Sequence, residues 1–305
     1  MSNQYTHNSV LCHSVLENLS TCHPPVVVDA TFGRGGHSKA ILSILPEEGR
    51  LFAFDMDPDA AKLADQVDDT RFTFINSRFS EMSNRLLELG IEKVSDIVAD
   101  LGVSSPQIDD PSRGFSFAKD GPLDMRMTST GESASDWIAA ATIPEMESVF
   151  RKYGEERFAK RIANAIDVER GKSAILTTKQ LADIISNAIP YVDRGQHPAT
   201  RVFQAIRIHI NKELEELSSV LAQSSGILMS GGRLIVISFH SLEDRIVKRF
   251  ISSLANPVVP RFLPLKECEL PVPSMKFIGR FRPSAAEVRD NRRSRSAILR
   301  VAEKI

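Results

Sequence analysis

Residues 29–37, DATFGRGGH, combine an early acid with three clustered glycines. Glycine permits a tight turn with positive φ and lets a ligand approach the main chain. The segment follows an apolar run and precedes a helical pattern, and the N–H groups of a helix start can hold an anion. Asp55 ends the next apolar run, where an acid typically binds ribose hydroxyls. The combination predicts a site for a nucleotide-type cofactor; a tight structural turn is the alternative.

The glycine spacing indicates which cofactor fits. A dinucleotide-binding turn follows G-x-G-x-x-G, and its third glycine would fall on Ser38. S-adenosylmethionine carries one methionine carboxylate in place of a pyrophosphate, so one anion site suffices for it. We therefore expect S-adenosylmethionine rather than a nicotinamide dinucleotide.

A further acid, Asp100, ends another apolar run and opens the segment 100–107, DLGVSSPQ. Amino-methyltransferases place the target amine at this strand end, beside an acid or serine, two prolines and an aromatic residue. The double proline is missing here, so the general motif is incomplete. Asp100, or a nearby carbonyl group, is a candidate acceptor for the amine hydrogens.

Short apolar runs alternate with helical patterns, which is typical of a doubly wound α/β fold with a parallel sheet. The expected strands lie at 26–30, 50–54, 71–75, 96–99, 231–238 and 296–302, with helices at 38–45 and 60–67. Between 108 and 195 the patterns are helical only, at 134–141, 145–153, 155–168 and 178–188. We therefore expect a core of residues 1–107 and 196–305 and an inserted helical domain, 108–195, that recognises the substrate. No element is predicted for the proline-rich residues 254–278.

One long helix is expected to begin near His197. Its apolar stripe runs along one face at helical spacing: Phe203, Ile206, Ile210, Leu214, Leu217 and Leu221. A polar row that includes Arg207 lies beside the stripe. This row either lines a cleft or forms hydrogen bonds at the border of the buried face.

Composition limits the partners and the cellular location that we expect for the protein. The 305 residues carry a formal net charge of -1, so nucleic-acid binding needs a local basic patch. The C-terminal part has one, with Arg280, Arg282, Arg289, Arg292, Arg293, Arg295 and Arg300 around only Glu287 and Asp290. It is either an RNA contact or a solvated tail. The three cysteines have no metal-binding spacing, and neither a signal peptide nor a membrane span is present, so we expect a cytoplasmic protein without a metal.

Several longer motifs resemble the RsmH family, also called MraW, and the resemblance covers nearly the whole chain. The motifs are 29–38 (DATFGRGGHS), 100–107 (DLGVSSPQ), 113–117 (RGFSF), 120–127 (DGPLDMRM), 153–157 (YGEER), 197–201 (HPATR) and 238–245 (SFHSLEDR). The resemblance implies a class I methyltransferase core with a Rossmann-like fold. It also implies N4-methylation of a cytidine in the decoding region of 16S ribosomal RNA, with S-adenosylmethionine as the donor.

The resemblance also implies roles for single residues. Gly35, Gly36 and His37 match the cofactor turn of the family, and Asp55 would bind the ribose. Phe79 would border the adenine. Asp100 and Gln107 would complete the cofactor pocket. The partner would be 16S ribosomal RNA, within a small-subunit particle or free.

Three further residues are candidates for substrate contact. Trp137, the only tryptophan, lies in the inserted domain and would either stack on an extruded cytosine or pack inside the domain. Arg207 belongs to the polar row described above. His240 follows a strand and would contact RNA, the cofactor or only its structural neighbours.

Three other functions stay open at this point. A DNA amino-methyltransferase would share the cofactor site and differ in substrate. A nicotinamide-dependent oxidoreductase is disfavoured by the glycine spacing. A non-catalytic RNA-binding assembly factor would keep the fold without the reaction. Neither a general base nor an oligomeric state is predicted.

Overall fold

The computed structural model describes residues 9–128, 130–190, 197–257 and 271–305 and divides into two compact units. The first unit comprises the residues up to Gly102 together with Leu214–Ile305, and the second is Val103–Glu213. The second unit covers more of the sequence than the insertion expected at 108–195. Its extra C-terminal part includes helix α10 (Thr200–Asn211), which folds with the other helices rather than with the sheet.

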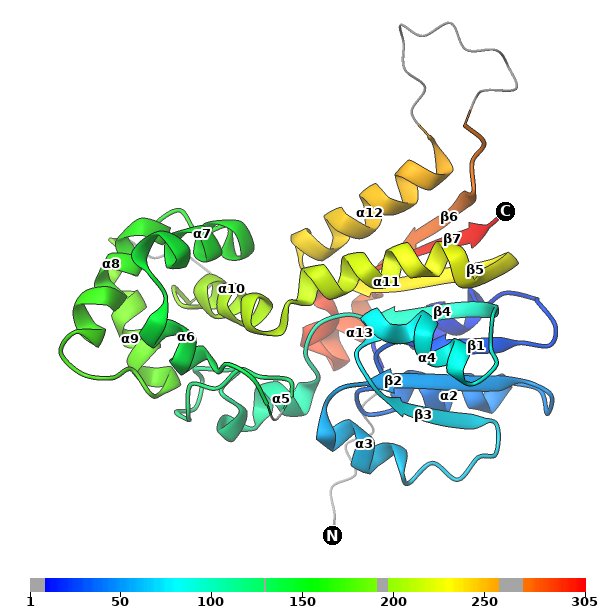
Figure 1. Ribbon diagram of the computed structural model, residues 1–305, viewed down its shortest axis with the longest axis horizontal. Helices are drawn as coiled ribbons and strands as arrows, with labels where there is room; N and C mark the ends of the chain where they lie inside the picture. Colours follow the sequence, from blue (N-terminus) through cyan, green and yellow to red (C-terminus); the bar gives the residue numbers. More distant parts are fainter. Residues whose placement is uncertain (1–8, 129, 191–196, 258–270) are drawn as a thin grey trace, which may run out of the picture. The chain divides into compact units, whose positions relative to one another are not determined.

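One sheet, in the order β3-β2-β1-β4-β5-β7-β6, forms the centre of the first unit (Figure 1). Its strands are β1 (Val26–Asp29), β2 (Arg50–Asp55), β3 (Phe72–Asn76), β4 (Val94–Asp100), β5 (Leu228–Ser238), β6 (Met275–Phe281) and β7 (Ile298–Lys304). β1 to β5 pair in parallel, whereas β7 is antiparallel to both β5 and β6. The strand order reverses at β1, which creates the switch point where doubly wound sheets bind ligands. The expected Rossmann-like α/β core is confirmed.

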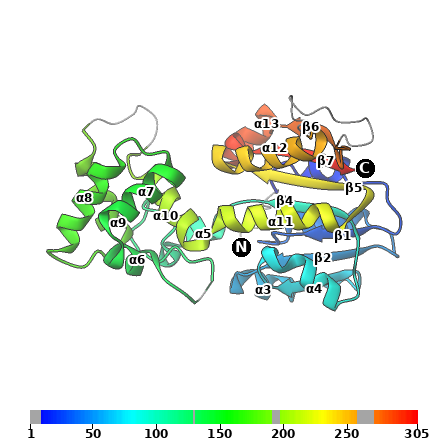
Figure 2. The same ribbon diagram turned by 45° about the horizontal axis from the view of Figure 1, so that its top comes forward.

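Helices cover both faces of this sheet. α4 (Met82–Glu88), α11 (Glu213–Ile227) and α12 (Ser241–Ala255) bury apolar side chains against one face, where α11 and α12 lie side by side (Figures 1 and 2). α1 (Cys12–Glu17) and α2 (Gly36–Ile44) pack on the other face, and α3 (Pro58–Ala64) packs beside Phe32. Burial on both faces explains the continuous apolar runs of the central strands.

The second unit is helical, as the patterns between 108 and 195 predict. Its elements are α5 (Ser105–Asp109), η2 (Pro111–Arg113), α6 (Ala134–Ala140), α7 (Ile143–Gly154), α8 (Ala159–Arg170), α9 (Thr178–Ala188) and α10. Capping boxes start four of them, at Ser104, Ser133, Thr142 and Thr177, because a side-chain oxygen there accepts from the first turn. Within its described residues, the only strand-like pairing is an isolated bridge between Pro122 and Thr177.

One expectation about the fold is wrong, and one strand was not predicted. The helix expected to run on from His197 breaks at Lys212, which has φ 53 and separates α10 from α11. The apolar stripe continues across this break, so periodicity alone could not reveal it. Strand β6 lies partly within 254–278, where no element was predicted. It is an edge strand with exposed Lys276 and Arg280, so its pattern is more polar than that of a central strand.

Candidate cofactor and catalytic site

The glycine turn lies between β1 and α2, at the carboxyl ends of the parallel strands. Gly33 and Gly35 have φ values of 54° and 72°, which favour glycine. A Cβ on Gly35 would lie 2.7 Å from Phe32 Cζ, and a Cβ on Gly36 would lie 2.0 Å from Ser9 Oγ. Since α2 begins at Gly36, the N–H groups of its first turn have no acceptor within the helix. The turn therefore presents the bare main chain that an anionic group needs.

Asp29 is fully buried at the end of β1. Its two carboxylate oxygens accept hydrogen bonds from Ser38 Oγ (2.7 Å) and Thr31 N (3.1 Å). Burial raises the pKa of this carboxyl, whereas the nearby His37 charge and these hydrogen bonds oppose the shift. Asp29 thus joins the end of β1 to the first turn of α2 and holds the glycine segment between them.

His37 and Asp100 meet inside this arrangement. His37 is 5% exposed, and its Nε2 lies 3.4 Å from Asp100 Oδ2. Burial lowers the pKa of His37, but contact with the Asp100 carboxylate, a contact with Cys12 and the charge of Asp29 outweigh burial and raise it to about 10. His37 is therefore an imidazolium at neutral pH. Among the described residues, buried Asp100 Oδ1 has no hydrogen-bond partner, which leaves an acceptor open for a bound molecule.

Asp55 ends β2 beside the same turn. Its oxygens accept from Gly33 N (2.7 Å) and Asp57 N (2.9 Å). Burial raises the pKa of Asp55 to about 6, with smaller contributions from the charges of Asp57 and Asp29, against the two hydrogen bonds. Each oxygen keeps a second lone pair, so the ionised carboxylate can still accept from two hydroxyl groups. This geometry fits a ribose.

Phe79 begins the short helix η1 (Phe79–Glu81) just after β3 and is half-buried against the core. The adjacent Ser80 is held from α11, because its N–H donates to Glu216 and its carbonyl accepts from Gln223. The partly exposed ring at this strand end suits a flat apolar ligand such as adenine.

Gln107 belongs to the helical unit. Its side-chain oxygen accepts from Ser104 N (2.8 Å) and so caps α5. The structure thus gives Gln107 a capping role, and its cofactor contact stays a prediction. The other expected cofactor residues, Gly35, Gly36, His37, Asp55, Phe79 and Asp100, all belong to the first unit.

Trp137 packs inside the helical unit. It is 6% exposed, and its ring lies 6.2 Å from that of Phe150, edge-on, and 4.8 Å from that of His209. This is the environment of a core aromatic residue, and it leaves little ring surface for a base. Of the two alternatives for Trp137, the geometry favours packing within the domain.

Arg207 and His240 also have partners. Arg207 forms a two-point ion pair with Glu213, at 2.8 and 2.9 Å. His240 caps α12, and its Nε2 lies 3.2 Å from Glu243 Oε1, while Oε2 of the same acid accepts from Phe239 N. These contacts are structural, and substrate contact by either residue stays a prediction.

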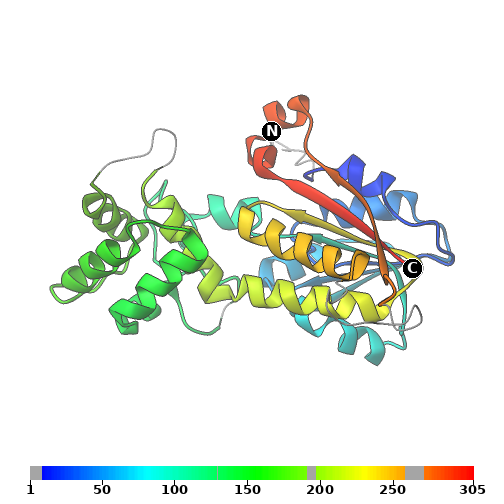
Figure 3. The same ribbon diagram turned by 90° about the horizontal axis from the view of Figure 1, so that it is seen from above.

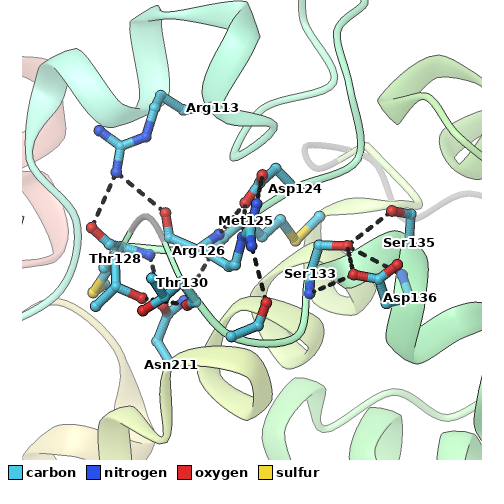
Figure 4. A network of polar contacts seen from close by, with 12 residues as sticks. Arg113, Asp124, Met125, Arg126, Thr128, Thr130, Ser133, Ser135, Asp136 and Asn211 are labelled. Atoms are coloured by element: carbon cyan, nitrogen blue, oxygen red, sulfur yellow. Dashed lines mark hydrogen bonds and ion pairs between the residues drawn. The ribbon is translucent and has the colours of Figure 1, made fainter.

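The motif 120–127 contains a polar network that its residue pattern alone did not predict (Figure 4). Asn211 accepts from Met127 N and donates to Met125 O, both at 2.8 Å. Arg113 donates to the carbonyls of Arg126 (3.1 Å) and Met127 (3.2 Å). Met125 is fully buried with φ 61, a backbone conformation that costs about 1–3 kcal/mol outside glycine. Anchors from two separate elements therefore hold this loop in one shape.

The described residues lack two other kinds of feature. No group of His, Cys, Asp and Glu side chains there is arranged to hold a metal ion. In the same residues, no helix combines the length and the apolar character that crossing a bilayer requires.

A doubly wound sheet with a glycine turn after β1 and acids at the ends of β2 and β4 defines a cofactor-binding α/β enzyme of Rossmann type. Within that class the chain belongs to the MraW methylase family, whose family model matches residues 4–305.

Individual relatives match this chain over its full length. The chain is 51% identical to "Ribosomal RNA small subunit methyltransferase H" of Burkholderia ambifaria, over 100% of this chain and 99% of the relative. The protein of the same name from Burkholderia pseudomallei is 50% identical over the same shares. Among solved structures, an rRNA methylase from Streptococcus thermophilus is similar over 96% of this chain and 93% of that one, at 11% identity and a TM-score of 0.41.

Proposed function

We propose that this protein transfers a methyl group from S-adenosylmethionine to the N4 amine of a cytidine in the decoding region of 16S ribosomal RNA. The observation that carries the proposal is the group of glycine turn, Asp55 and Asp100 at one edge of the sheet, in a chain that belongs to a methylase family over its whole length. The name shared by its relatives, a small-subunit ribosomal RNA methyltransferase, supports the RNA class.

The residues of this edge match the parts of S-adenosylmethionine. The bare turn at Gly35 and Gly36 suits the methionine carboxylate, and Asp55 has free lone pairs for the ribose hydroxyls. Phe79 would border the adenine. The open acceptor on Asp100 and the imidazolium of His37 complete the set. When bound, the cofactor supplies a methyl group on a positively charged sulfur.

Cytosine N4 is a poor nucleophile because its lone pair is delocalised into the ring. The enzyme must therefore accept hydrogen bonds from the N4 hydrogens, so that the nitrogen becomes more tetrahedral, and must hold it in line with the methyl group. Asp100 Oδ1 is buried and has no partner among the described residues, so it is our candidate acceptor. His37 places a positive charge beside this carboxylate.

The helical unit, Val103–Glu213, is our candidate for recognition of the RNA. The anchored loop at 124–127 offers a preformed surface for this purpose. Arg207 and His240 stay candidates for substrate contact, while Gln107 is kept as a candidate cofactor residue.

The test is a methyl-transfer assay with labelled S-adenosylmethionine on three substrates: small-subunit particles, free 16S RNA and DNA. We expect label in ribosomal RNA, recovered as N4-methylcytidine after digestion to nucleosides. Preferential labelling of DNA would favour the DNA amino-methyltransferase. Cofactor binding without transfer to any substrate would favour a non-catalytic assembly factor.

A further inference from the structure

We propose that the arginine-rich segment 280–295, which comprises the last two residues of β6 and most of its connection to β7 and is called the connection below, binds the phosphate backbone of the RNA substrate. The identity of that RNA rests on the proposed function. From the sequence alone, this segment could be either an RNA contact or a solvated tail. Four structural observations favour the RNA contact.

The first observation is exposure. Six arginines of the connection have exposed side chains: Arg280, Arg282, Arg289, Arg292, Arg293 and Arg295. No lysine occurs between residues 277 and 303. The planar guanidinium group binds phosphate through two parallel hydrogen bonds and stacks on unpaired bases, which lysine cannot do. The choice of cation therefore suits single-stranded RNA.

The second observation concerns ion pairs. Elsewhere in the first unit, Arg71, Arg233 and Arg300 each form an ion pair with a neighbouring acid. In the part of the chain that the structure describes, Arg282, Arg289, Arg292 and Arg295 form none. One of the two acids in the connection, Glu287, accepts a hydrogen bond from Leu11 N at 2.7 Å. The connection thus keeps a local positive potential in a chain whose net charge is -1.

The third observation is position within the sheet. Asp100 at the end of β4 pairs with Ile237, and the next residue of β5, Ser238, pairs with Ile298 at the start of β7. Leu299 in turn pairs with Phe281 at the end of β6. Since β7 runs antiparallel to β5, the connection from β6 to β7 lies at the same edge as the carboxyl ends of the parallel strands. That edge also carries the proposed cofactor site.

The fourth observation is local order. α13 (Ala285–Asp290) and η4 (Arg292–Ser296) form the connection, at the end of β6 and β7 away from the C-terminus (Figure 3). Ser284 Oγ accepts from Glu287 N, and Asn291 Oδ1 accepts from Arg293 N. In a 3-10 helix the side chains at i and i+3 eclipse, so Arg292 and Arg295 project from the same side. Capped elements reduce the ordering that binding would require, unlike a solvated tail.

The test compares two charge-matched variants with the wild-type chain. The first carries R289Q, R292Q and R295Q. The control carries K62Q, R85Q and K93Q, which removes the same charge from exposed positions on α3, on α4 and before β4. The probe is a labelled single-stranded RNA of about 20 nucleotides, longer than a typical single-strand site, and its affinity is measured by anisotropy across a salt series.

We expect the first variant to bind RNA about tenfold or more weakly. Its plot of log affinity against log salt should be shallower by about 2, since each lost phosphate contact on a single strand removes about 0.7 from the slope. The control variant should keep the wild-type slope. Both should bind S-adenosylmethionine as the wild type does, by calorimetry, which shows that each is folded.

Two results would overturn the proposal: an unchanged slope in the first variant, or an equal fall in both variants, which would reflect net charge alone. Equally effective competition by a polyglutamate peptide of matched charge would also overturn it, in favour of an acidic protein partner. A wild-type chain that binds RNA with the expected slope but methylates no small-subunit RNA would refute the proposed function and leave the RNA-binding surface standing.

Discussion

The positive charge on His37 interacts with both Asp29 and Asp100 of the candidate site. The Nε2 atom of His37 lies 3.4 Å from Asp100 and its charge interacts with that of Asp29, and its pKa of about 10 means that all of this charge is present at neutral pH. A buried cation with acidic neighbours contributes more than one at the surface, because water screens it less. The charge state of His37 therefore affects the stability of the core.

Replacing His37 by glutamine should destabilise the protein by about 3–5 kcal/mol at pH 7, because buried Asp29 and half-buried Asp100 lose a neighbouring positive charge. The pH dependence gives a second readout. The folded pKa lies above the ordinary 6.5, so the stabilisation is present below 6.5 and is lost as the pH rises towards 10. We expect wild-type stability in urea to decline across that window. In His37→Gln this decline should be absent, and a variant with an unchanged decline would contradict our assignment of the charge.

Asp55 should titrate within the pH range over which binding of the cofactor can be measured. Its ionised form accepts from hydroxyl groups, and its pKa is about 6, so affinity for S-adenosylmethionine should rise as the pH increases from 5 to 7. The stability of the fold has the opposite dependence on pH. Because the pKa of Asp55 is raised in the folded protein, its contribution to stability falls as the pH rises from the ordinary value of 3.8 to about 6.

Asp55→Asn should bind the cofactor about tenfold more weakly at pH 7, since hydrogen bonds to charged groups contribute about 1.5–3 kcal/mol. Its affinity should also lose the rise between pH 5 and 7. Calorimetry at both pH values measures this, and an Asn variant that keeps the wild-type pH dependence would show that another group titrates.

The place of the candidate cofactor residues in the fold could be predicted because several of them follow strand ends. Asp29, Asp55 and Asp100 each end an apolar run, and parallel strands bring such ends to one edge. The contact between His37 and Asp100 could not be predicted, since the two residues lie far apart in the chain. Nor could the ion pair of Arg207 with Glu213, which depends on the turn at Lys212.

Among the elements, α6 depends most visibly on one side chain. Trp137 packs edge-on against Phe150 of α7 and contacts His209 of α10, so it joins three helices of the unit. Trp137→Ala should destabilise the protein by about 3–5 kcal/mol because it leaves a large cavity. Trp137→Phe fills most of that space and should cost much less.

Thermal unfolding and RNA methylation at limiting RNA separate the two roles of Trp137. If the residue is core, Trp137→Phe retains methylation, and Trp137→Ala loses it only at temperatures where it unfolds. A fully stable Trp137→Ala variant with methylation reduced ten- to a hundredfold would instead support stacking on the target base.

Element types were predictable where hydrophobic periodicity was strong. The central strands and the helices between 134 and 188 follow directly from it. The break at Lys212 was missed because lysine is an ordinary helix former and gives no stop signal. β6 was missed because it is an edge strand with polar residues beside a proline-rich stretch.

At the scale of the whole molecule, we propose a different role for each of the two units. The sheet unit carries the glycine turn, the acids and the arginine connection, all at one edge. The helical unit carries the anchored loop and the buried Trp137. Composition alone predicted none of this, since a net charge of -1 hides a local cluster of arginines.

The most direct test of the proposed activity is mass spectrometry of small-subunit RNA from a strain that lacks this gene. We expect a decoding-region fragment to lose one methyl group, carried on cytidine N4, and to regain it when the wild-type chain is supplied. Gly35→Val should not restore it, because a β-branched residue at φ 72 would collide with Phe32 in the cofactor turn. Persistence of N4-methylcytidine in that fragment after deletion would contradict the proposed function.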